Sequence, residues 1–127
     1  MVDPSILEVF AAPGEEPFVV EHTAEEFTSL CPKTGHPDFG VVTLRYQPRA
    51  AGAGGVCVEL RSLKLYYQSY RSEGIFYEAV TNVIRDHLVA RLEPVWLQVV
   101  TRWRGRGGIH SEIRADFGDV PGHYLGR

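Results

Sequence analysis

The sequence has little cysteine, no excess of positive charge and no long apolar run. Its 127 residues include 2 cysteines, too few for a framework of disulfides. The net charge is −3 at pH 7, which argues against non-specific binding to nucleic acid, because such binding usually needs a basic surface. No apolar stretch approaches the roughly 20 residues needed to cross a bilayer, and no basic, apolar leader opens the chain. These absences predict a cytoplasmic protein with no membrane partner and no direct nucleic-acid partner.

The histidines do not suggest a metal site either. His22, His36, His110 and His123 are scattered along the chain, without the paired spacing that zinc ligands usually show. A zinc site that combined Cys31 with His36 would lack this spacing signature. We therefore expect no bound metal.

The length predicts one domain that spans residues 1–127, because the chain is too short for two domains of ordinary size. Three prolines and a glycine cluster near its start, at Pro4, Pro13, Gly14 and Pro17. We expect residues 1–16 to form a loosely held N-terminal arm.

The apolar pattern predicts a hairpin, then two helices, then a second hairpin. Alternating or β-prone residues place strands at 18–22, 41–46, 56–60, 95–99 and 109–117. Helical spacing appears over 63–70, with Ser62 as the N-cap, and over 76–92. This order favours an α+β fold, in which an antiparallel sheet carries both helices on one face.

Such a small open sheet would leave two edge strands without partners. Unpaired edges promote association unless they are covered or paired with another subunit. We infer that copies of the chain assemble into a ring-like homo-oligomer.

Cys31 is the candidate nucleophile, because it opens a loop rich in proline and glycine rather than lying in a core strand. Loops on a rigid scaffold often carry function, and the nearby Lys33 favours a thiolate. Asp38 ends the same loop and is the candidate proton-transfer partner. Structural alternatives stay open, since a free cysteine is often a small buried apolar residue and an aspartate often stabilises a turn.

Other charged residues are candidates for ligand binding. Arg61 and Lys64 are three residues apart, so on a helix they share a face on which a phosphate can bind. Glu78, in the first turn of the second helix, can accept a pair of N–H groups. The turn at 104–108 offers two arginines and backbone N–H groups to an anion. The alternatives are solvated surface charges, a carboxylate favoured by the helix dipole and a plain hairpin turn.

Taken in order, these segments resemble the NADPH-dependent 7-cyano-7-deazaguanine reductases, which are the nitrile reductases of queuosine biosynthesis. Residues 27–39 are similar to that family's catalytic loop, and residues 59–67 to its NADPH-associated motif. Residues 76–78 and 106–109 fall where the remaining family signatures fall. The resemblance implies the tunnelling fold in its short single-module form, with subunits arranged in a ring and active sites between them.

The resemblance also implies a mechanism. Cys31 attacks the carbon of a nitrile to give a covalent thioimide, and Asp38 moves the thiol proton to the nitrile nitrogen. Hydride from NADPH, delivered twice, then reduces the carbon to the amine of 7-aminomethyl-7-deazaguanine. The implied substrate-binding residues are Glu78, Tyr77, Glu59 and Ser62. The implied cofactor-binding residues are Arg61, Lys64, Arg106 and Gly107.

The sequence departs from the reductase pattern at two of these positions. Tyr77 stands where the family usually has histidine, and Arg61 replaces the usual lysine. A similar archaeal family adds ammonia to the same nitrile in transfer RNA, which makes archaeosine, and it lacks the NADPH motif. The largely intact motif at 59–67 favours the reductase, whereas Tyr77 leaves the archaeal activity open. A non-catalytic purine- or pterin-binding module of the same fold is a third hypothesis, and it would need no cysteine at position 31.

Overall fold

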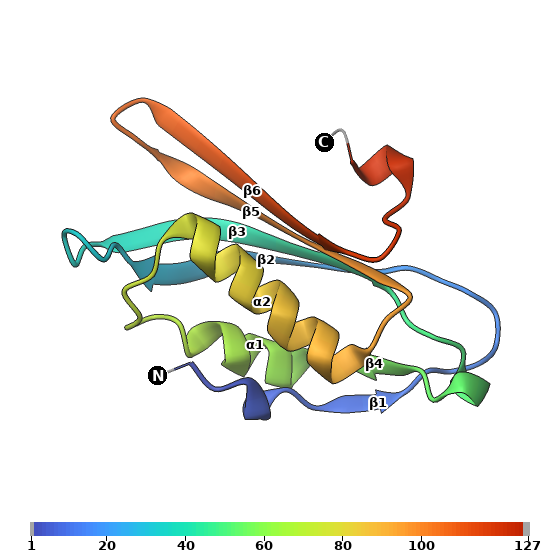
Figure 1. The fold of residues 1–127 in the computed structure, drawn as a ribbon. Helices are drawn as coiled ribbons and strands as arrows, with labels where there is room; N and C mark the ends of the chain where they lie inside the picture. The colour runs from blue at the N-terminus through green and yellow to red at the C-terminus, as the bar shows by residue number, and fades with distance from the viewer. Residues whose placement is uncertain (1, 126–127) are drawn as a thin grey trace.

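In the computed structural model, which describes residues 2–125, a four-stranded antiparallel sheet carries two helices on one face (Figure 1). The strand order is β2-β3-β5-β6, and the strands are β2 (Val20–Leu30), β3 (Pro37–Gln47), β5 (Trp96–Arg106) and β6 (Ile109–Phe117). The helices α1 (Leu60–Gln68) and α2 (Tyr77–Leu92) lie between the two hairpins in the sequence. The predicted order of hairpin, two helices and hairpin is confirmed, as is the α+β fold class.

The prediction of a loosely held N-terminal arm is wrong. After a 3₁₀ turn, η1 (Pro4–Ile6), the strand β1 (Val9–Ala11) pairs antiparallel with β4 (Val56–Val58) in a separate two-stranded sheet. Leu7 is 1% exposed and belongs to the main core. The prolines therefore mark the boundaries of short elements, while one buried leucine and the strand pairing hold the segment against the domain.

The core fills the space between the helices and the four-stranded sheet. Alternation along β3 sends Val42, Leu44 and Tyr46 to the helical side, where each is fully buried. The other large buried side chains include Phe27, Tyr66, Tyr70, Ile84, Leu88 and Leu97. Each buried aliphatic side chain contributes about 1.5–3 kcal/mol. Within the described residues, neither helix is long and apolar enough to cross a membrane.

Two element boundaries near the candidate site differ from those predicted. β2 continues to Leu30, well beyond the expected 18–22. The sequence did not predict this continuation because a bulge between Ala24 and Phe27 interrupts the regular alternation of the strand. β3 begins at Pro37, so Asp38 lies in a strand and not in the loop. Leu30 and Pro37, which flank the Cys31 loop, are thus strand residues, so the sheet fixes both ends of the loop.

Candidate active site

The Cys31 loop is a tight connection between β2 and β3, closed by its own backbone. The Cys31 N–H donates to the His36 carbonyl at 2.9 Å, and the Gly35 N–H donates to the Cys31 carbonyl at 2.8 Å. Gly35 has a φ of +73°, a conformation that favours glycine. The loop base is tied to the segment before α2, since the Leu30 N–H donates to the Glu73 carbonyl at 2.8 Å. These bonds fix the backbone that presents the Cys31 thiol.

The surroundings of the half-buried Cys31 thiol favour the thiolate. Its pKa is lowered to about 7, first by a hydrogen bond from the Thr34 side chain, then by the backbone N–H groups of Thr34 and Lys33, with a smaller contribution from Arg106. The other free cysteine, Cys57, is buried, and burial raises the pKa of its thiol. Because the thiolate is the nucleophile, only Cys31 has the properties of a reactive cysteine.

The lowered pKa predicts how Cys31 reacts with iodoacetamide. We expect the alkylation rate to rise with pH around a midpoint of about 7, because the thiolate fraction rises as pH passes the pKa. In Thr34→Val the midpoint should move upward, since the strongest hydrogen bond to the thiolate is lost. Peptide mapping after timed alkylation measures both rates, and Cys57 serves as the internal control that stays unlabelled. A midpoint near 9 in the unaltered protein would contradict this description of the loop.

The Asp38 carboxylate is held by two side chains that come from distant parts of the chain. The Arg106 Nη1 donates to Oδ1 of Asp38 at 2.8 Å, and the Tyr77 hydroxyl donates to the same oxygen at 3.3 Å. The Asp38 side chain is 4% exposed, whereas that of Arg106 is 47% exposed. Arg106 also contacts the Cys31 thiol, which is the largest contribution to its own raised pKa. The structure thus brings Cys31, Asp38, Tyr77 and Arg106 together.

Tyr77 reaches Asp38 because its ring is fixed against the sheet. It stacks on Trp103 with ring centroids 4.1 Å apart and planes 8° from parallel. Trp103 in turn lies against β3 at Gly40, where a Cβ would meet the indole ring at 2.8 Å. The Thr81 hydroxyl bonds both the Tyr77 carbonyl, at 2.8 Å, and the Thr101 hydroxyl, at 2.7 Å. These contacts hold the first residue of α2 over the end of the sheet.

Arg106 is placed by the two-glycine turn that joins β5 and β6. Arg106 pairs with Ile109, so Gly107 and Gly108 form the turn, with φ values of +57° and +81°. Two consecutive residues with positive φ are typical of the type I′ turn that matches strand twist. β5 extends to Arg106, so the strands reach further into the predicted 104–108 turn than expected. The Arg106 guanidinium thereby reaches Asp38, which is 68 positions away in the sequence.

Glu59 and Ser62 are used at the start of α1. Glu59, not Ser62, is the N-cap: its carboxylate accepts from the backbone N–H groups of Arg61, at 2.8 Å, and Ser62, at 2.7 Å. The prediction of Ser62 as N-cap is wrong because the helix begins at Leu60, three residues before the predicted start at residue 63. These backbone bonds lower the pKa of Glu59. The buried Ser62 hydroxyl accepts from the Glu8 N–H at 2.9 Å, which links α1 to the N-terminal segment.

Glu78 and Arg61 are exposed at the ends of their helices. Glu78 lies in the first turn of α2, directly after Tyr77, where the helix dipole favours a carboxylate. Arg61 lies in the first turn of α1. No hydrogen bond joins either side chain to the Cys31, Asp38, Tyr77 and Arg106 group within residues 2–125. The structure of one chain therefore presents the predicted site residues in separate groups.

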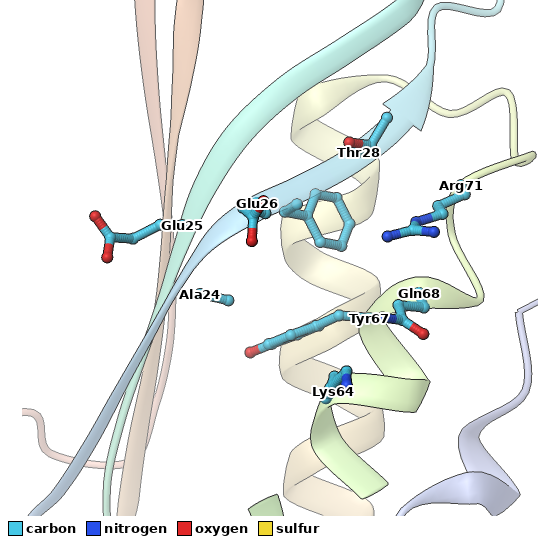
Figure 2. Close-up of a pocket in the computed structure, with 9 residues that line it drawn as sticks. Ala24, Glu25, Glu26, Thr28, Lys64, Tyr67, Gln68 and Arg71 are labelled. Atoms are coloured by element: carbon cyan, nitrogen blue, oxygen red, sulfur yellow. The ribbon is translucent and has the colours of Figure 1, made fainter. Parts of the chain in front are cut away.

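A groove of about 220 Å³ lies between α1 and the bulged part of β2, and Figure 2 shows the side chains that line it. On one side the groove is lined by residues of α1 and the following turn, namely Lys64, Tyr67, Gln68 and Arg71. The Tyr67 hydroxyl is buried and has no hydrogen-bond partner among the described residues. Sequence reasoning selected Lys64 but missed Arg71, although the spacing of 64, 68 and 71 is the helical signal that would have found it.

The described part of the chain holds no group of three or more histidine, cysteine, aspartate or glutamate side chains placed to bind a metal ion. The groups that the structure brings together at this site are a thiol, a carboxylate, a phenol and a guanidinium.

Comparison with known proteins gives a consistent set of relatives. Residues 37–121 match the family model described as QueF-like protein. A protein of Prosthecochloris aestuarii named NADPH-dependent 7-cyano-7-deazaguanine reductase is 48% identical over 113 residues, which cover 88% of this chain and 92% of that protein. A protein of the same name from Rhodopirellula baltica is 48% identical over 114 residues, 89% of this chain and 90% of that protein.

A solved structure shares the fold. The archaeosine synthase QueF-Like in its apo form superposes with a TM-score of 0.72, and the match covers 81% of this chain and 96% of that one. Sequence identity is 24%, so this likeness concerns the fold alone. It agrees with the tunnelling fold expected from the sequence.

Proposed function

Because the chain belongs to the QueF-like family, with close relatives named NADPH-dependent 7-cyano-7-deazaguanine reductases, we propose that it reduces the nitrile of 7-cyano-7-deazaguanine with NADPH. It is an oxidoreductase, and its product is the primary amine 7-aminomethyl-7-deazaguanine, an intermediate of queuosine biosynthesis. The observation that carries the mechanism is that Arg106 interacts with both the Cys31 thiol, whose pKa is lowered, and the buried carboxylate of Asp38.

Cys31 performs the first step as a nucleophile. Its thiolate attacks the nitrile carbon, a carbon–sulfur bond forms, and one bond of the nitrile triple bond becomes an electron pair on nitrogen. Covalent attachment replaces one difficult reduction by easier steps. A pKa of about 7 suits this role, since roughly half of the thiol is ionised near neutral pH.

Asp38 moves the proton. It takes the thiol proton and delivers it to the nitrile nitrogen, so that a neutral thioimide forms and no charge is left on nitrogen. Arg106 and Tyr77 both donate to Oδ1 and thereby orient the carboxyl group. We propose Tyr77 and Arg106 as positioning residues in this step. For Arg106 this role comes in addition to the predicted cofactor binding, which stays a prediction, as it does for Gly107.

Substrate recognition is assigned to Glu78. The exposed Glu78 carboxylate, next to Tyr77, can accept two N–H groups from the guanine-like edge of the substrate. A ligand that lacks these N–H groups would cover the carboxylate without a hydrogen bond, which costs free energy and so favours the correct substrate. Glu59 and Ser62 also stay predictions as substrate-binding residues. In the free chain the Glu59 carboxylate caps α1, and the Ser62 hydroxyl donates to the Glu59 carbonyl at 2.8 Å.

The cationic side of the groove beside α1 suits a phosphorylated cofactor. Lys64 and Arg71 supply two cations on this side, whereas the carboxylates of Glu25 and Glu26 line the β2 side. The buried Tyr67 hydroxyl has no hydrogen-bond partner among residues 2–125. Cations and hydroxyl donors are the groups that bind phosphate oxygens. We propose that Lys64 and Arg71 hold NADPH phosphates here, joined by Arg61 on the same helix. Bound NADPH supplies the hydride for each of the two reductions.

Arg71 gives a prediction that separates cofactor binding from chemistry. We expect Arg71→Ala to raise the KM for NADPH about tenfold or more, the usual loss for one charge-assisted hydrogen bond, and to change the rate at saturating NADPH little. Arg71→Lys should keep most of the affinity. Arg102→Ala, which removes the same charge from the exposed face of β5, is the matched control. Steady-state kinetics measure these constants, and an unchanged KM in Arg71→Ala would exclude Arg71 from the cofactor site.

We further propose that the chain assembles into a ring-like homo-oligomer in the cytoplasm and acts on the free base without binding nucleic acid. Two features support the assembly. β2 and β6 are the edge strands of the described sheet, and the exposed Glu78 and Arg61 lie apart from the Cys31 group within one chain. Sites shared between subunits would bring such separate groups together.

The test of the proposed function is oxidation of NADPH that depends on 7-cyano-7-deazaguanine. Purified protein should consume two equivalents of NADPH for each nitrile reduced. A parallel reaction with ammonia and nitrile-bearing transfer RNA tests the archaeosine-forming activity that Tyr77 leaves open. Product formation in the ammonia reaction without any NADPH oxidation would replace the reductase by this second activity.

A further inference from the structure

One buried hydroxyl at the active-site end of the sheet has no hydrogen-bond partner. Ser29 lies on β2, is 0% exposed, and its Oγ bonds to no other residue between 2 and 125. Leaving a hydroxyl unpaired in a protein interior costs free energy, so such groups are rare without a reason. Neither the fold nor the proposed mechanism so far gives Ser29 a role.

Ser29 is the cross-strand neighbour of Asp38. The register of β2 and β3 places the two residues directly opposite each other. Opposed residues in an antiparallel pair carry their side chains on the same face, with Cβ atoms about 4.5–5.5 Å apart. Both are buried on the helical side, whereas the next residue of β3, Phe39, is exposed on the other face. Cys31 follows Ser29 by two positions, so the hydroxyl lies beside the reacting pair.

The two oxygens of Asp38 are used unequally. Oδ1 accepts hydrogen bonds from both Arg106 and Tyr77, and within the described residues no bond reaches Oδ2. When Asp38 carries the thiol proton, that proton belongs on Oδ2, because two donors already fill Oδ1. A serine hydroxyl both donates and accepts, so it can pair with Oδ2 in either protonation state.

We propose that Ser29 is a positioning residue for Asp38: its hydroxyl donates to Oδ2 of the carboxylate and accepts from Oδ2 when the carboxyl is protonated. In the structure the Ser29 Oγ makes no bond to Asp38, so this contact requires rotation about the Cα–Cβ bond of Ser29. The proposal rests on the proposed function, because it requires Asp38 to carry a proton between Cys31 and the substrate. The groups around the Asp38 carboxyl are then Ser29 from β2, Tyr77 from α2 and Arg106 from β5, and Arg106 also interacts with the Cys31 thiol.

The test measures thioimide formation without NADPH, by intact mass after timed mixing with 7-cyano-7-deazaguanine. We expect Ser29→Ala to form the adduct about tenfold more slowly, the loss that one ordinary hydrogen bond produces in a rate. Its melting temperature should stay the same or rise, because the variant removes an unpaired buried hydroxyl. Ser29→Thr, which keeps the hydroxyl on a strand-favouring residue, should recover most of the rate. The exposed Ser72→Ala is the matched control.

Each outcome decides the matter. A slower adduct at an unchanged melting temperature supports the positioning role. If Ser29→Ala melts at a lower temperature, then recovery of the rate in Ser29→Thr supports the role and a persistent loss overturns it. An adduct rate in Ser29→Ala equal to that of the unaltered protein overturns it as well. An unaltered protein that forms no adduct at all refutes the covalent mechanism of the proposed function, and an unaltered protein that oxidises no NADPH with this substrate refutes the function itself, which keeps these failures distinct from that of Ser29.

Discussion

Cys31→Ala should abolish both the reduction of 7-cyano-7-deazaguanine and the covalent adduct with it. The thiolate is the only group of the Cys31, Asp38, Tyr77 and Arg106 set that can attack a nitrile carbon, and alanine has no nucleophile. Because the Cys31 side chain is only half-buried, the variant should fold normally. NADPH oxidation measures the activity, and intact mass spectrometry with substrate alone measures the adduct.

The matched control for this experiment is Cys57→Ala. Cys57 is buried on β4, away from the loop, and burial raises the pKa of its thiol, so it should form no adduct. The control variant should therefore retain the adduct and the reductase activity. If Cys31→Ala still gained the mass of the substrate, the nucleophile would lie elsewhere and the mechanism proposed above would be wrong.

Asp38→Asn should reduce turnover by about 10²–10⁴-fold, the range usual for loss of a general acid–base group. Asparagine has nearly the same shape, and its side-chain oxygen can still accept from Arg106 and Tyr77. The geometry of the site should thus persist while the proton carrier is lost. The rate at saturating substrate and NADPH is the measurement, with the melting temperature recorded beside it.

Asp119→Asn, on an exposed segment near the C-terminus, controls for the loss of one carboxylate. It should match the unaltered protein in both measurements. Turnover of Asp38→Asn within a few-fold of the unaltered rate would show that protons reach the nitrile nitrogen by another route. In that case the contacts of Arg106 and Tyr77 with Asp38 would be structural only.

The sequence predicted the elements whose pattern is local and regular. The helical stripe over 76–92, bounded by Gly74 and Pro94, gave α2 almost to the residue. β2 was shortened because Glu25 and Glu26 fall in a bulge that breaks the alternation. The N-terminal segment looked loose because its stabilising partners, β4 and Ser62, lie about fifty residues away in the sequence. A residue pattern reveals periodicity only within a short stretch of sequence, so it does not predict pairing between segments this far apart.

The same limit applies to the site. Cys31 and Asp38 were found from loop composition and from the family resemblance, both of which are visible in a short stretch. The partners of Asp38 were not found, since Tyr77 and Arg106 are 39 and 68 positions away. Glu59 looked like a ligand residue, although a carboxylate directly before a helix is also a capping residue. Ser29 carried no sequence signal, because only the strand register places it opposite Asp38.

The most direct test of the central claim follows one covalent species through the reaction. The protein is mixed with 7-cyano-7-deazaguanine in the absence of NADPH, and its intact mass and modified peptide are recorded before and after NADPH is added. The mechanism predicts the mass of one substrate on Cys31, which then disappears as NADPH is oxidised and the amine is released. An adduct that NADPH leaves unchanged, but that ammonia converts, would contradict the reductase and establish the alternative.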